Sequence, residues 1–149
     1  MSVTATTAQH QATGTAASDL LRTSLRVDSW CTAAFGLIML VGGEWLSDPL
    51  GLPTTWSIPF GIAMLGGAAA LALIAGYPRI PPRLGATVVI GNTLSCVAML
   101  VLTFTGVVPL TGLGTTFMVV GALVVAAFAD VEYMGLRRLQ AAPSHPLDR

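Results

Sequence analysis

The chain has 149 residues, of which 54% are hydrophobic and 9% charged, with a formal net charge of zero. Soluble globular domains carry about 25% charged residues, so this composition excludes an ordinary soluble domain. All seven basic residues are arginines, which excludes lysine Schiff-base chemistry and the P-loop. A nucleic-acid partner is excluded as well, because no cluster of basic residues indicates a binding surface for it.

The uncharged segments are long enough to cross a membrane. Residues 49–78 and 84–129 contain no Asp, Glu, Lys or Arg, whereas a helix needs about 20 apolar residues to span a bilayer. A third uncharged run, residues 29–43, becomes a full span when Arg26 and Trp45 lie at opposite interfaces. Because an open sheet cannot satisfy its backbone in hydrocarbon, we expect an all-α membrane protein, an up-down bundle of four transmembrane helices.

Taken in chain order, residues 1–18 are rich in Thr, Ala, Ser and Gln, which predicts a disordered tail. The first basic residue is Arg22, so the basic start of a secretory signal is missing and the first hydrophobic segment is expected to stay as a helix. Residues 19–140 form the predicted transmembrane domain, and residues 141–149 a second flexible tail. The four predicted spans are residues 25–46, 56–76, 84–107 and 115–133.

Prolines and glycines mark the predicted connections between the spans. A loop at residues 47–55 ends the first span, and Trp45 and Trp56 flank it as interfacial anchors. A basic, proline-rich turn at residues 77–83 precedes the third span, and residues 109–114 turn the chain into the fourth.

The arginines predict the orientation, since they lie on one side of the predicted spans while the loops at residues 47–55 and 109–114 contain none. By the positive-inside rule we expect a multi-pass protein of the plasma or inner membrane with both termini in the cytoplasm. The predicted interfacial arginines are Arg22, Arg26, Arg79, Arg83, Arg137 and Arg138.

A weak internal similarity suggests a duplicated helix hairpin. Residues 51–56 (GLPTTW) before the second span resemble residues 112–117 (GLGTTF) before the fourth. We therefore hypothesise two hairpins related by an axis along the membrane normal.

Three polar residues within the predicted spans are the candidate site, two near the predicted cytoplasmic face and Asn92 nearer the midplane. Asp28 and Asp130 fall just inside the arginines, and Asn92 is the one carboxamide within a span. Ionisable groups at such positions face protein or water and have partners, so these residues predict a cytoplasm-facing polar cluster. Two other interpretations stay open: the carboxylates pair with arginines to fix helix ends, and Asn92 joins helices by a structural hydrogen bond.

No cofactor or metal site is expected. Cys31 and Cys96 lie at different predicted depths, which argues against a disulfide between them, and His10 and His145 lie in the predicted tails. No group of potential ligands has metal-binding spacing. Glu44 and Asp48 are expected at a solvated loop end, with a cation-attracting rim as the alternative.

Four short segments carry a family resemblance, namely residues 26–28 (RVD), 50–53 (LGLP), 127–130 (AFAD) and 135–138 (GLRR). With these segments the chain resembles small four-helix integral membrane proteins common in actinobacteria, which are distantly similar in architecture to DoxX-like proteins. The resemblance implies membrane location and fold and carries over no functional residue.

Two architectural relatives imply different functions. DoxX-like proteins are associated with redox systems or partner subunits, but the predicted spans lack the His ligands of a haem or quinone site. Small multidrug-resistance exporters carry a carboxylate deep in their first helix, whereas residues 29–43 contain no acid.

The expected function is that of a non-enzymatic accessory or interaction subunit of a membrane complex. The alternative is a small-solute carrier or channel that acts as an oligomer through Asp28, Asn92 and Asp130. The expected partners are the lipid bilayer and either another membrane protein or further copies of the chain.

Overall fold

The computed structural model describes the backbone of residues 2–141 and the side chains of residues 15–141. Within this range the secondary structure is helical: α1 (Ser2–Val41), α2 (Gly43–Leu50), α3 (Thr54–Ala75), α4 (Pro82–Phe104) and α5 (Gly112–Ala141). Four of these helices, α1, α3, α4 and α5, are long and apolar enough to cross a membrane. The prediction of an all-α, four-span membrane protein is therefore confirmed.

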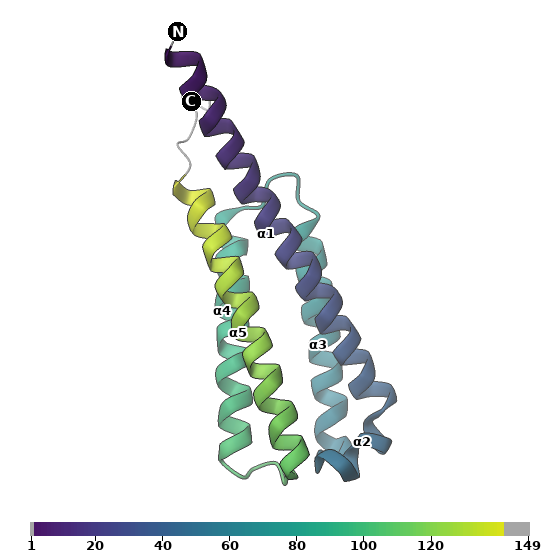
Figure 1. Ribbon diagram of the computed structural model, residues 1–149. Coiled ribbons are helices and arrows are strands. Elements are labelled where there is room, and N and C mark those ends of the chain that lie inside the picture. Colours follow the sequence, from purple (N-terminus) through teal and green to yellow (C-terminus); the bar gives the residue numbers. More distant parts are fainter. Residues whose placement is uncertain (1, 142–149) are drawn as a thin grey trace.

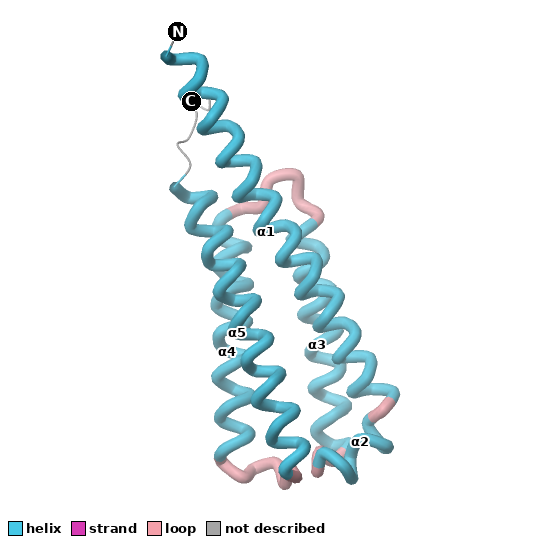
Figure 2. Tube along the Cα trace, viewed as in Figure 1, coloured by secondary structure: helices cyan, strands magenta, loops and turns pink. Residues whose placement is uncertain are grey.

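The four long helices run alternately up and down (Figure 1). Ser2, Ala141 and the loop at residues 76–81 lie toward one end of the bundle, and α2 and the loop at residues 105–111 lie at the other. The connecting loops gather at these two ends (Figure 2). We call the end with residues 76–81 the arginine end, because the six predicted interfacial arginines lie toward it.

Packing between the helices is uneven. α1 packs most extensively on α3, α4 packs on α5, and α1 also contacts α5, whereas α3 and α4 touch each other little. The helices of each hairpin, α1 with α3 and α4 with α5, thus pack on each other, as a duplication requires. The equivalence of the two hairpins stays a prediction. In α4 only Gly85 and Val88 are buried, so this helix presents most of its surface outward.

Two apolar clusters make up the core. The first, toward the arginine end, joins Leu21 and Leu25 of α1 with Leu71, Ala75, Ile80 and Val88. The second, at the opposite end, joins Met39, Leu50, Leu52 and Val108. Large apolar side chains also cover the outside, where Trp30 is 79% exposed and Leu73 is 73% exposed. A bilayer suits such a surface, because lipid tails are as apolar as these side chains.

The N-terminal segment differs from its prediction. The sequence predicts a disordered tail through residue 18, whereas α1 continues as helix back to Ser2. Extending an existing helix adds one hydrogen bond per residue without a new nucleation step, and Ala favours this. Ala17 is already buried in the bundle, so packing begins within the predicted tail. Of the tail predicted from residue 141, residues 142–149 lie outside the described range.

The end of the first span also differs from its prediction. The span is predicted to run to residue 46 with a loop at residues 47–55, but α1 stops at Val41 and α2 occupies residues 43–50. Gly43 packs so closely on α3 that a Cβ there would lie 2.7 Å from Ser57 Oγ. A larger side chain at residue 43 would have to displace the Ser57 side chain, so a glycine suits this contact between α2 and α3.

The loops at this end are held together by close backbone contacts and hydrogen bonds. Gly51 ends α2 with φ +65°, and a Cβ there would overlap the carbonyl oxygen of Pro109. The Thr111 amide donates to the Leu50 carbonyl at 3.1 Å, and Thr111 Oγ1 donates to the Pro49 carbonyl at 2.6 Å. These bonds fix the end of α2 against the start of α5.

Candidate functional site

A polar cluster joins three of the spanning helices inside the bundle. Asn92 Nδ2 on α4 donates to Asp28 Oδ2 on α1 at 2.8 Å and to Glu132 Oε2 on α5 at 3.0 Å. Thr32 Oγ1, one turn beyond Asp28, donates to Asp28 Oδ1 at 3.0 Å. We call these four residues the acid–amide cluster.

Helical periodicity places each member on a core-facing position. On α1, Leu21, Leu25 and Asp28 follow one another at spacings of four and three residues, which keeps them on one face. Asn92 lies one turn after the buried Val88. Glu132 lies one turn before the buried Leu136. The cluster therefore occupies positions that apolar residues hold elsewhere on the same helices.

The acidic members are removed from the surface. Asp28 is 3% exposed and Glu132 is 0% exposed. Glu132 Oε1 is buried and has no hydrogen-bond partner. Buried polar atoms nearly always have partners, because an unmade hydrogen bond costs about 1–3 kcal/mol. The unpartnered oxygen indicates that Glu132 Oε1 can accept a hydrogen bond from one more donor or bind a positively charged group.

The electrostatics of the cluster point to the same need. Asp28 Oδ2 and Glu132 Oε2 lie at most about 6 Å apart, because both accept from one nitrogen, at 2.8 and 3.0 Å. Two ionised carboxylates at that distance or closer repel by at least about 3 kcal/mol at an effective dielectric constant of about 20. The donors that bond to them, the Asn92 amide and the Thr32 hydroxyl, are both neutral. A doubly ionised cluster would thus lack a compensating charge.

The arginines do not supply that charge. Arg22 Nη2 instead donates to the backbone carbonyls of Tyr77 and Pro78, at 2.8 and 2.9 Å. Among the described residues the side-chain partners of Asp28 are Thr32 and Asn92, and no arginine bonds to it. Asn92 bonds across helices, to Asp28 and to Glu132. The five other predicted interfacial arginines are exposed: Arg26, Arg79, Arg83, Arg137 and Arg138.

An apolar layer separates the cluster from the arginine end. Leu21 is fully buried and lies between glycines of two neighbouring helices. A Cβ at Gly135 would lie 3.1 Å from Leu21 Cβ, and one at Gly85 would lie 3.1 Å from Leu136 Cδ1. These glycines let α1 and α4 each pack closely on α5, so leucine side chains close the bundle next to the cluster.

The sequence identified two of the three acid and amide residues. Asp28 and Asn92 come together as predicted, but Asp130 lies on the exposed face of α5 and is not part of the cluster. Two residues further, about 200° around the helix, Glu132 takes that place. The signal for it is the spacing of the buried positions Met118, Ala122, Ala129 and Leu136, which puts residue 132 on the inner face.

Other predicted features are placed as follows. Trp45, on α2, is 85% exposed, and Trp56 packs on Phe60 with ring centroids 5.6 Å apart. Cys31 and Cys96 are both free, as expected from their spacing. Among residues 15–141, whose side chains the structure describes, no group of three or more His, Cys, Asp or Glu is arranged to hold a metal ion.

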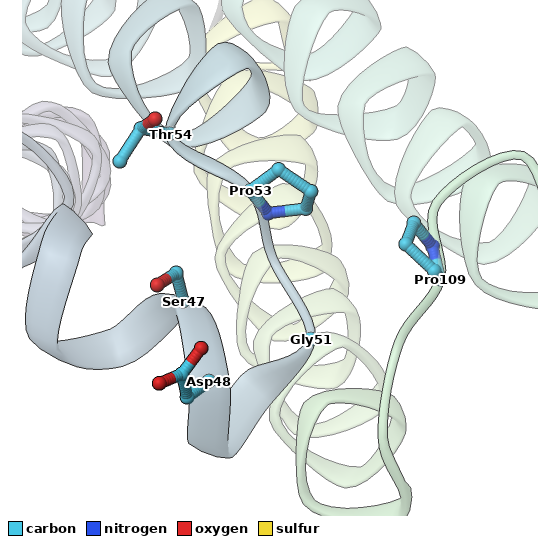
Figure 3. A pocket seen from close by; sticks show the side chains of 6 residues that line it. All are labelled: Ser47, Asp48, Gly51, Pro53, Thr54 and Pro109. Atoms are coloured by element: carbon cyan, nitrogen blue, oxygen red, sulfur yellow. The ribbon is translucent and has the colours of Figure 1, made fainter.

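A second polar feature lies at the opposite end of the bundle. A depression of about 370 Å³ is lined by residues of α2, α3 and the loops between the helices (Figure 3). Its lining residues are Ser47, Asp48, Gly51, Pro53, Thr54 and Pro109. Asp48 is its one ionisable group and is exposed, so a solvated loop end explains this feature.

No family model, curated protein or solved structure matched the chain.

Proposed function

We propose that this integral membrane protein is a carrier for a small cation, or for a small solute driven by one. The observation that supports this function is the acid–amide cluster, in which two buried carboxyl groups from different helices share one neutral amide. Ionisable groups inside a membrane are costly and typically mark an ion or substrate path. The non-enzymatic accessory subunit expected from the sequence has no comparable support.

The cluster suits a carrier because it links binding to helix packing. Asp28, Asn92 and Glu132 come from α1, α4 and α5, so a cation bound there stabilises the contact among three helices. Its loss leaves two like charges facing each other and favours separation of those helices. A ligand that binds one arrangement better than another shifts the population toward it, as alternating access requires.

We further propose that the arginine end faces the cytoplasm of the cell that makes the protein. Six arginines lie toward this end, and the loops at the other end contain none. Four helices enclose little space, and α3 and α4 touch each other little, so the carrier is proposed to work as an oligomer.

The test is ion movement in liposomes that contain the purified protein. Vesicles filled with a pH-sensitive dye receive an imposed pH gradient, with Na⁺, K⁺ or methylammonium as the external cation. The variants are Asp28→Asn and Glu132→Gln, which remove one acid each with little change in size. Asp130→Asn is the matched control, because it makes the same change on the exposed face of α5.

The proposal predicts that the wild type and Asp130→Asn change the internal pH faster than empty vesicles with at least one of these cations. Asp28→Asn and Glu132→Gln should lose most of that flux. If all four proteins behave like empty vesicles, the carrier function is refuted. A stoichiometric second protein, purified with the chain from its own host, would then support the accessory-subunit role.

A further inference from the structure

We propose that the cation held by the acid–amide cluster is a proton, carried by Glu132 on its unpartnered oxygen Oε1. This inference rests on the proposed carrier function and names the ion at that same site. Two observations carry it: the position of the Asn92 amide nitrogen, and the unequal hydrogen bonding of the two acids.

The amide nitrogen occupies the place that a metal ion would need. Asn92 Nδ2 lies 2.8 Å from Asp28 Oδ2 and 3.0 Å from Glu132 Oε2. Each of its two hydrogens thus serves one carboxyl group, and the nitrogen holds the space between them. A sodium or potassium ion bridging these oxygens would meet a hydrogen-bond donor instead of further oxygen ligands.

The two acids differ in how well their charge is supported. Both oxygens of Asp28 accept hydrogen bonds, one from Thr32 and one from Asn92. Glu132 accepts one bond at Oε2, while Oε1 is buried without a partner in a side chain that is fully enclosed. Two carboxyl groups in unequal environments divide their roles, and the less supported one keeps the proton. Glu132 is therefore the protonated member.

Among residues 15–141, no other charged group of the packed helices competes for this proton. On α1, Arg26 and Asp19 are exposed, and the partly buried Arg22 donates to the backbone carbonyls of Tyr77 and Pro78. On α5, Asp130, Tyr133, Arg137 and Arg138 are exposed. On α4, Arg83 is exposed and Cys96 is partly buried, as is Cys31 on α1. α3 contains no charged residue. Asp28 is thus the acid that faces Glu132 directly.

Binding is a simple protonation. An O–H bond forms at Glu132 Oε1 with a proton that comes from the aqueous phase, and no electron moves. Release returns the proton to water and leaves a carboxylate next to Asp28.

The chain's composition makes a direct test practical. It contains two glutamates, the exposed Glu44 on α2 and the buried Glu132. The full chain is labelled with ¹³C at the glutamate carboxyl, reconstituted in lipid, and followed across a pH titration by solid-state NMR. We expect one of the two labelled carboxyls to be protonated at neutral pH. That signal should vanish in Glu132→Gln and persist in Glu44→Gln.

Three results would overturn the proposal. One is that both labelled carboxyls are ionised at neutral pH. Another is that the protonated signal persists in Glu132→Gln. The third is that added NaCl or KCl at constant pH removes the signal, because a metal ion would then occupy the site. If Glu132→Gln does not fold, the comparison of the wild type with Glu44→Gln still decides whether the protonated carboxyl belongs to Glu132. A protonated Glu132 without any flux in liposomes would leave this inference standing and refute the carrier function alone.

Discussion

Replacing Asn92 by Leu removes the one residue that bonds to both acids. In soluble proteins a hydrogen bond to a charged group contributes about 1.5–3 kcal/mol. Interhelical bonds in a membrane protein average about 0.6 kcal/mol and reach about 1.7 kcal/mol, because the unfolded helices also find partners in the membrane. With two bonds lost, at 2.8 and 3.0 Å, we expect the free energy of unfolding to fall by about 1–3 kcal/mol.

The assay is reversible unfolding in mixed micelles by titration with a denaturing detergent. Ser95→Leu is the matched control, since residue 95 lies one turn further along α4 and is exposed. We expect Asn92→Leu to remain folded under mild conditions, because the expected loss is smaller than the stability of about 5–15 kcal/mol typical of native proteins.

A double-mutant cycle tests whether the loss arises from the cluster. Combined with Glu132→Leu, the Asn92→Leu change should cost less than it does alone, since the acid that it leaves unpaired is already absent. Equal losses for Asn92→Leu and Ser95→Leu, or strictly additive effects in the cycle, would refute the reasoning.

Three further predictions concern packing and orientation. Gly114→Ala should lower the free energy of unfolding by about 1–3 kcal/mol, since its Cβ would overlap the Leu50 carbonyl, while Gly112→Ala, with nothing within 4 Å, should be nearly neutral in the same detergent titration. Arg22→Gln should speed hydrogen exchange in the loop at residues 76–81, whose carbonyls the guanidinium binds, and the exposed Arg26→Gln should not; equal exchange would contradict this role. A reporter active only in the cytoplasm should work when fused to the C-terminus and fail within the loop at residues 105–111; the reverse pattern would contradict the proposed orientation.

The fold could be predicted well from the sequence because the membrane restricts the choices. Uncharged runs of this length have few alternatives to spanning helices. The loops lie near the prolines and glycines that mark the predicted connections. The errors fall at helix ends. α1 begins at Ser2 because helix extension is cheap, and it stops at Val41, where Gly42 separates it from α2. Neither effect is visible in hydropathy.

The candidate site was only partly predictable. Asp28 and Asn92 are recognisable because polar residues in a span need partners. Asp130 and Glu132 both lie near the arginines, and depth alone does not say which face of α5 turns inward. Rotation of the helix decides that, and it is set by how the glycines and alanines of α5 pack on α1 and α4.

The sequence by itself determined that the chain enters a membrane, how many times it crosses, and roughly where it turns, since these properties depend on transfer of each segment from water to lipid. Only the tertiary structure decided which polar atoms meet. Along the chain, Asn92 is 64 residues from Asp28 and 40 residues from Glu132. Their convergence depends on the rotation and close packing of three helices, which local composition does not encode.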